Sequence, residues 1–118
     1  MISRTWRGVA QTEEADNYIR HLQSETIPQL SRISGFVSAL ILRRPTADGV
    51  EFMIVTTWRS MDAIRHFTGD REDVAVVPEA VQAMMVDYDT KVAHYEIVDT
   101  SRAVPCDSSL VKTNDREQ

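Results

Sequence analysis

Residues 56–67, TTWRSMDAIRHF, contain the change from a strand to a helix that decides the fold. An apolar strand pattern stops at Trp58, Ser60 has the side chain of a helix N-cap, and Asp62 falls in the first turn. That turn has unpaired N–H groups and favours negative charge, so both residues suit their places. The junction also puts aromatic side chains and a histidine where a pocket can open between a sheet and a helix.

Around this junction the pattern predicts four strands and two main helices. Strands are expected at residues 2–10, 36–42, 50–58 and 91–98. Helices are expected from residue 12 to an end or a kink near Pro28 and at residues 60–67, with a short helical piece from Pro78 to about Met85. The order β-α-β-β-α-β indicates an α+β, ferredoxin-like fold, an antiparallel sheet with both helices on one face. We expect one domain over residues 1–98 and a polar C-terminal tail over residues 99–118.

Two of the expected strands are apolar on both sides. Ser38 is the only polar residue in the strand at 36–42, and in the strand at 50–58 Phe52 and Ile54 alternate with the apolar Met53 and Val55. A sheet with one wet face would alternate apolar and polar residues. Because two helices cover only one face, we expect a homodimer in which the uncovered sheet faces of two copies oppose each other.

The composition is that of an ordinary globular domain. The 118 residues are 42% hydrophobic and carry a formal net charge of −5. An acidic balance is unfavourable for binding nucleic acid or an anionic membrane surface. The chain has no apolar run that would span a bilayer and starts without a signal-peptide pattern. With Cys106 as the single cysteine, a cytoplasmic location is expected.

Three histidines are the candidates for acid–base chemistry, and no metal-binding motif accompanies them. His66 follows Trp58 by eight residues, so it is either a general base facing the cleft between helix and sheet or a solvent-facing residue beside Arg65. His94 and Glu96 point to the same face of the last strand. They form either a proton-relay pair or a polar pair at the dimer seam.

The aromatic residues have two interpretations as well. Trp58 and Trp6 could stack on a flat aromatic ligand, or they could fill the core, which is the commoner role of tryptophan at a strand end. Tyr18 could hydrogen-bond a ligand hydroxyl, although its place on the apolar stripe of the first helix favours packing.

Residues 2–98 resemble the antibiotic biosynthesis monooxygenase family of dimeric α+β barrels. The likeness lies in Thr57-Trp58-Arg59-Ser60 with Ala63, Ile64 and Phe67, in Val76-Val77-Pro78 leading to Tyr88-Asp89, and in the last strand, Val92 to Glu96. The resemblance implies a pocket between sheet and helices in each protomer. For some members it also implies oxygenation of electron-rich phenols without metal or flavin, with an electron passing directly from the deprotonated substrate to dioxygen.

A haem-degrading branch shares this barrel but its residues are not matched. That branch uses an asparagine on the first strand and a tryptophan and a histidine near the second helix. Residues 3–9 contain no asparagine, Phe67 stands at the tryptophan position, and Val76 and Val77 stand where the histidine would fall. We therefore expect no haem, metal or other cofactor.

Two functions follow as hypotheses. The first is a cofactor-independent monooxygenase acting on a small electron-rich aromatic or polyketide-like compound, with His66, or else His94, as the base. Its expected substrate-binding residues are Trp58, Tyr18, Trp6 and Phe67. The second is a non-catalytic dimeric barrel that binds a small hydrophobic ligand as a stress or regulatory module. Fold alone does not choose between them.

Overall fold

The computed structural model describes residues 1–101, so the expected tail from residue 102 onward and Cys106 lie outside the described residues. The strands and helices follow one another along the chain as β1 (Ile2–Ala10), η1 (Thr12–Glu14), α1 (Ala15–His21), η2 (Leu22–Thr26), α2 (Ile27–Ser31), β2 (Phe36–Pro45), β3 (Val50–Trp58), α3 (Met61–Thr68), α4 (Glu79–Gln82), β4 (Met85–Tyr88) and β5 (Ala93–Glu96). No helix in this described part is long and apolar enough to cross a membrane.

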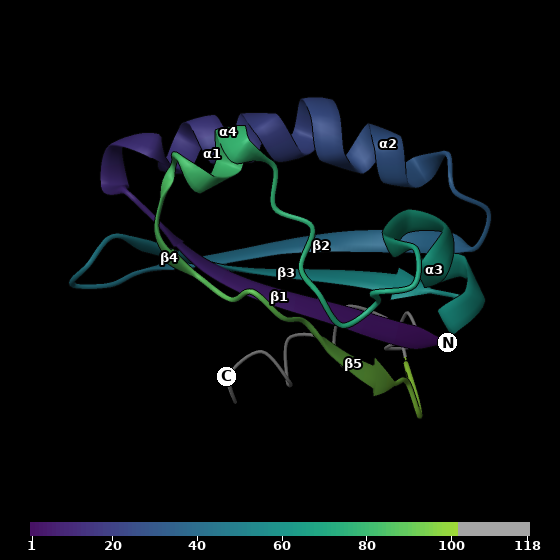
Figure 1. Ribbon diagram of the computed structural model, residues 1–118. Coiled ribbons are helices and arrows are strands. Elements are labelled where there is room, and N and C mark those ends of the chain that lie inside the picture. Colours follow the sequence, from purple (N-terminus) through teal and green to yellow (C-terminus); the bar gives the residue numbers. More distant parts are fainter. Residues whose placement is uncertain (102–118) are drawn as a thin grey trace, which may run out of the picture.

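The sheet is antiparallel, with the strand order β2-β3-β1-β4 and with β5 also paired to β1. β4 pairs with residues 8–10 of β1, whereas β5 pairs with residues 2–5, so together they occupy the place of a single edge strand. The helices lie over one face of the sheet (Figure 1). The expected ferredoxin-like α+β fold is confirmed.

The helix-covered face holds the core in two clusters. One gathers around Phe52 and Tyr18, and the other around Trp58 and Ile64. Both clusters use alternate residues of β3, since Phe52, Ile54, Thr56 and Trp58 share one face of the strand. A pocket lies between the sheet and the helical layer where the two clusters meet.

Among the described residues 1–101, no helix lies over the opposite face of the sheet (Figure 1). Leu40, Leu42 and Tyr95 on this face are 54%, 46% and 60% exposed. Glu51 is almost buried here between Arg7 and Arg44, at 3.3 and 3.1 Å. The exposed leucines agree with the apolar pattern from which a homodimer was predicted, and the dimer itself stays a prediction.

Pro28 does not end the first helical region. It has no N–H to bond the carbonyl of Ser24, and its ring would clash with that carbonyl in a regular α-helix. The chain instead makes a wide, π-type turn over η2, closed by the bond from the Ile27 N–H to the Leu22 carbonyl. The helix then continues through α2 to Ser31.

The end of the fold differs from the sequence prediction. The helical piece that starts at Pro78 was expected to reach about Met85, and no strand was predicted at residues 86–88, but residues 85–88 form β4, paired with β1. Four residues are too few for a helical or alternating period to be recognised, and pairing with a neighbouring strand decides their conformation. The last strand is also shorter than the expected 91–98, because regular pairing covers only Ala93–Glu96.

Candidate functional site

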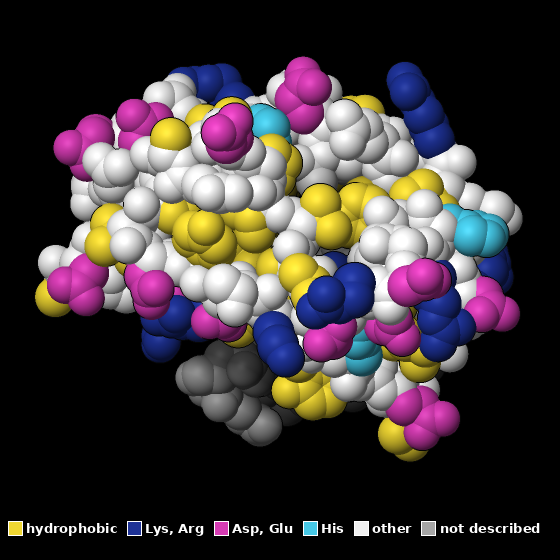
Figure 2. Space-filling model, in the orientation of Figure 1, with side chains coloured by type: hydrophobic (Ala, Val, Ile, Leu, Met, Phe, Trp, Pro, Cys, Tyr) yellow, Lys and Arg dark blue, Asp and Glu magenta, His cyan; other side chains and the backbone are white. Residues whose placement is uncertain are grey.

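The pocket under the helical layer has a volume of about 90 Å³ and a half-open mouth. Figure 2 shows hydrophobic side chains gathered below α4, between β4 and the segment that joins α3 to α4. The lining is almost wholly apolar, with Arg4, Tyr18, Thr26 and Thr56 supplying its polar side chains beside the two tryptophans. The other lining residues are Leu22, Leu30, Ile54, Phe67, Ala75, Val76, Val77, Pro78, Val81 and Val92.

Side chains on the helix-covered face of β1 and β3 form the floor of the pocket. Arg4 and Trp6 point to the helix-covered face of β1, where they lie opposite Thr56 and Ile54 of β3. The wall comes from the segment after α3, residues 75–78, which runs alongside. Two strands therefore set the floor rigidly, while an irregular segment forms one side.

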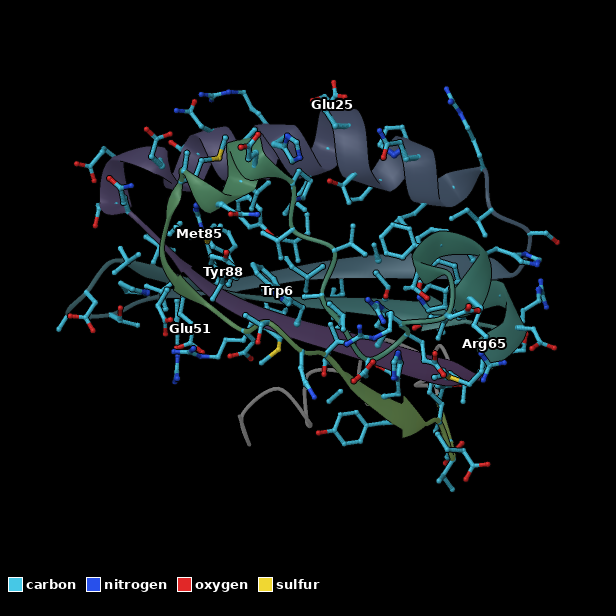
Figure 3. All side chains as sticks on the ribbon, viewed as in Figure 1. Trp6, Glu25, Glu51, Arg65, Met85 and Tyr88 are labelled. Atoms are coloured by element: carbon cyan, nitrogen blue, oxygen red, sulfur yellow. The ribbon has the colours of Figure 1, made fainter. Side chains whose placement is uncertain are left out.

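Trp6 is held at one end of the pocket. Its indole N–H donates to the Asp89 carbonyl at 2.8 Å, and its ring centroid lies 6.3 Å from that of Tyr18 and 6.4 Å from that of Tyr88. Figure 3 shows Trp6 and Tyr88 near each other below α4. A Cβ at Gly8 would collide with this indole, so the glycine leaves the ring its place.

Trp58 closes the other end. It is completely buried, its indole N–H donates to the Thr56 hydroxyl at 2.9 Å, and the Phe67 ring stacks on it with centroids 6.1 Å apart and an interplanar angle of 20°. The core-filling interpretation of Trp58 therefore describes its packing, although its surface also borders the pocket. Phe67 stands between Trp58 and the guanidinium of Arg4, whose central carbon is 5.8 Å from the Phe67 ring centroid.

Arg4 is the charged residue of the lining, and it is only 6% exposed. Its Nη1 donates to the Glu72 carbonyl at 2.5 Å and its Nη2 to the Val74 carbonyl at 3.2 Å. These bonds attach the segment after α3 to β1. Burial lowers the pKa of Arg4, but an arginine that starts from 12.5 stays charged at physiological pH.

His94 lies opposite Arg4 on β5, with its Nε2 3.0 Å from Nη1 of Arg4. Because the guanidinium can only donate, Nε2 must accept, which places the imidazole proton on Nδ1. Burial and then the Arg4 charge lower the pKa of His94, against the smaller opposing effects of Glu72 and Asp73. Arg4 is thus the partner of His94, and the expected pairing with Glu96 is not what holds the imidazole.

Tyr18 is buried, and burial raises its pKa well above the ordinary value of 10.0. The phenol is therefore neutral at physiological pH. It can exchange a hydrogen bond with a ligand in the pocket but cannot serve there as a base.

The structure brings together four of the six predicted site residues. Trp58, Tyr18, Trp6 and Phe67 all line the pocket, whereas His94 lies behind Arg4 and outside the lining. His66 is on the exposed side of α3 and does not reach the pocket either. Among the described residues no three histidine, cysteine, aspartate or glutamate side chains form a cluster suited to a metal ion.

Sequence reasoning missed Arg4 and Thr56. A charged residue in a strand is ordinarily assigned to the wet face, and a threonine carries no signal of its own. Strand alternation could have identified both, because side chains two residues apart on a strand point to the same face. Arg4 shares its face with Trp6, and Thr56 shares its face with Trp58.

Comparison with solved structures places the fold. A candidate antibiotic biosynthesis monooxygenase from Bacillus cereus has a TM-score of 0.64 at 16% identity, over 89% of this chain and 98% of that one. SnoaB, a cofactor-independent oxygenase from Streptomyces nogalater, has a TM-score of 0.59 at 16% identity, over 84% and 94%. The haem degrader MhuD from Mycobacterium tuberculosis, with two haems bound, has a TM-score of 0.55 at 13% identity, over 86% and 100%.

No family model matches the chain, and no curated protein matches it in sequence. The structural likenesses show that the chain has the ferredoxin-like α+β fold of antibiotic biosynthesis monooxygenase structures. At such low identity the likenesses do not identify a reaction, so the chemistry has to come from the residues of the pocket.

The pocket does not suit haem. Its lining residues include no histidine, cysteine or methionine to ligate the iron, and burial keeps Tyr18 a neutral phenol, whereas tyrosine ligates haem as the phenolate. The volume of about 90 Å³ is also too small to enclose a porphyrin. Val76 and Val77 contribute aliphatic surface to the wall.

Proposed function

We propose that the chain is a cofactor-independent monooxygenase that acts on a small electron-rich aromatic compound bound in the pocket. The observation that carries this proposal is the lining, in which Trp6, Tyr18 and Phe67 border a space otherwise surrounded mainly by aliphatic side chains. Such a lining suits a flat ring. The likeness in fold to SnoaB, a cofactor-independent oxygenase, adds support.

In the proposed reaction the substrate supplies the electrons. The ionised phenol passes one electron to dioxygen, and the two radicals combine at a ring carbon to give a peroxide, which takes up one proton from water in place of the one that the phenol released. Loss of hydroxide together with the ring C–H proton forms water and leaves a quinone. The protein binds and orients the ring and keeps most water from it.

Pocket size restricts the substrate. The volume of about 90 Å³ is below the roughly 150 Å³ of a protein cavity that holds benzene. The enclosed space therefore takes less than one whole ring, and the rest of that ring with its substituents lies in the half-open mouth.

A second candidate function is non-catalytic binding of a small hydrophobic ligand. The observation that favours it is the absence of histidine, aspartate and glutamate from the described lining. No general base therefore touches the space where a substrate would lie.

Oxygen uptake separates the two functions. Methylhydroquinone and 1,3,5-trihydroxybenzene would be tested with and without a chelator, against heat-denatured protein as the control for autoxidation. We expect uptake that the chelator leaves unchanged. Ala75→Phe fills the pocket and should reduce uptake at least about tenfold, whereas the same change at the exposed Ala80 should not.

The outcomes are distinct. Equal uptake by wild type and Ala75→Phe contradicts catalysis in this pocket, and ring binding without uptake favours the second function. His66→Ala belongs in the same assay, because a general base predicts a loss of about 10²–10⁴-fold. Its exposed position on α3 predicts turnover at the wild-type rate instead.

A further inference from the structure

The charge of Arg4 has no carboxylate partner among the described residues. The two acidic side chains of the neighbouring segment are paired elsewhere, Glu72 with Arg65 at 3.6 Å and Asp73 with Lys91 at 3.6 Å. Arg4 itself donates to two backbone carbonyls and to the neutral ring of His94. A buried cation stabilised only by neutral groups is costly, which makes its position beside an apolar pocket significant.

Arg4 also has N–H donors that the described residues do not use. A guanidinium has five N–H groups, and three of them are accepted by Glu72, Val74 and His94. The remaining two have no acceptor among the described residues. Since Arg4 lines the pocket, a ligand oxygen there can receive them.

We propose that Arg4 is the anion-binding group of the pocket, and that the ligand is an aromatic ring bearing one negatively charged oxygen, as phenolate or carboxylate. The inference deepens the proposed function, on which its catalytic meaning rests. A phenol bound next to a buried cation ionises more readily, because the charge on its oxygen is stabilised. Its proton leaves to water through the half-open mouth, and no protein base is needed.

A purely structural role for Arg4, holding the segment after α3 against β1, does not explain all of its features. Bonds to the Glu72 and Val74 carbonyls need donors but no charge, so a neutral side chain of similar reach would serve. Such a neutral side chain would lack the positive charge of Arg4 and its two unused N–H donors. The test therefore varies the charge of the ligand and that of residue 4 separately.

The probe is 4-nitrophenol, a single-ring phenol that ionises near neutral pH and whose phenolate absorbs visible light. Its methyl ether, 4-nitroanisole, has the same ring and cannot ionise. We expect bound 4-nitrophenol to titrate at least about one pH unit below the free probe, which corresponds to tenfold tighter binding of the phenolate. Benzoate and benzyl alcohol form the second pair, which tests whether carboxylates are also accepted.

Variants at position 4 identify the source of the preference. Arg4→Gln should bind 4-nitroanisole like the wild type but lose the tenfold preference, whereas Arg4→Lys, which keeps the charge, should retain part of it. Arg59→Gln, an identical change of charge at an exposed position, should bind both probes as the wild type does. Thermal melting of each variant establishes that it is folded.

Several results would overturn the proposal. These are equal affinity of the wild type for 4-nitrophenolate and 4-nitroanisole, an unchanged preference in Arg4→Gln, or failure of both probe pairs to bind. The wild-type comparison decides the matter even where a variant at position 4 does not fold. Because no oxygen is consumed in these titrations, phenolate preference without quinol oxidation would keep this proposal and reject the oxygenase.

Discussion

Arg4 and His94 lie opposite each other on β1 and β5, and the hydrogen bond between Nη1 and Nε2 requires a neutral imidazole. Protonation would place two cations against each other in a partly buried site. The groups that act on His94 are Arg4, Glu72 and Asp73, and the net effect is a pKa below the ordinary value of 6.5. This contact should make the stability of the fold depend on pH.

The expected pH dependence follows from proton binding in the two states. With a lower pKa in the folded than in the unfolded chain, the unfolded chain binds more protons between the two values. The free energy of unfolding should therefore fall as pH drops from about 6.5 through the folded pKa of His94. Urea titrations between about pH 5 and 8 measure it.

His94→Gln keeps an acceptor for Arg4 but does not titrate, so its unfolding free energy should change less over this range. His66→Gln, at an exposed position, should keep the wild-type slope. Identical slopes for wild type and His94→Gln would contradict the assignment.

At the scale of residues, residue type and strand or helix spacing predicted the aromatic lining of the pocket but not its charged residue. Trp6, Tyr18, Trp58 and Phe67 were recognisable because large aromatic side chains on an apolar stripe point inward. Arg4 was not, because an inward-facing cation contradicts the ordinary pattern of a strand. Only the packing of residues distant in sequence shows that its charge faces apolar neighbours.

Among the elements, α3 begins as its sequence predicted. Ser60 is the N-cap in extended conformation, and its hydroxyl accepts from the Ala63 N–H at 3.2 Å. Asp62 lies in the first turn, where negative charge is favourable. The strand–helix junction was predictable because its signals are local.

Ser60→Ala should lower the free energy of unfolding by about 0.5–2 kcal/mol, because one N–H of the first turn loses its acceptor. Ser60→Asp should cost little, since aspartate is an equally good cap. Chemical denaturation measures both. A loss of stability in Ser60→Asp as large as in Ser60→Ala would show that the hydroxyl acts in some other way.

β4 and η2 were not predictable in the same way. β4 is four residues long and depends on residues 8–10 of β1, some 75 positions earlier. The wide turn of η2 satisfies a constraint from Pro28 that could equally have ended the helix. In both cases several local structures suit the sequence, and tertiary packing selects one.

For the whole molecule, the sheet face opposite the helices is the feature that packing within residues 1–101 leaves unexplained. Leu40, Leu42 and Tyr95 are exposed there beside the Glu51 ion pairs. We propose that a second copy covers this face, burying more than the roughly 1,000 Å² expected of a specific interface.

Light scattering of wild type should then give twice the 13.4 kDa mass of the chain at low micromolar concentration. Leu40→Glu places a charge in the centre of the proposed interface and should give the mass of a single chain. Ala80→Glu, an exposed change on α4, should remain dimeric. A wild-type protein that is monomeric at this concentration would contradict the proposal.

The bonds of Arg4 also bear on the order in which the chain can assemble. Its partners Glu72, Val74 and His94 are 68, 70 and 90 residues further along the chain. During synthesis β1, the first helices and the β2–β3 hairpin are complete well before these partners leave the ribosome. Until then Arg4 has no acceptors and stays hydrated. Contacts this far apart in sequence also form slowly, so we expect the pocket wall to close after the β2–β3 hairpin has formed.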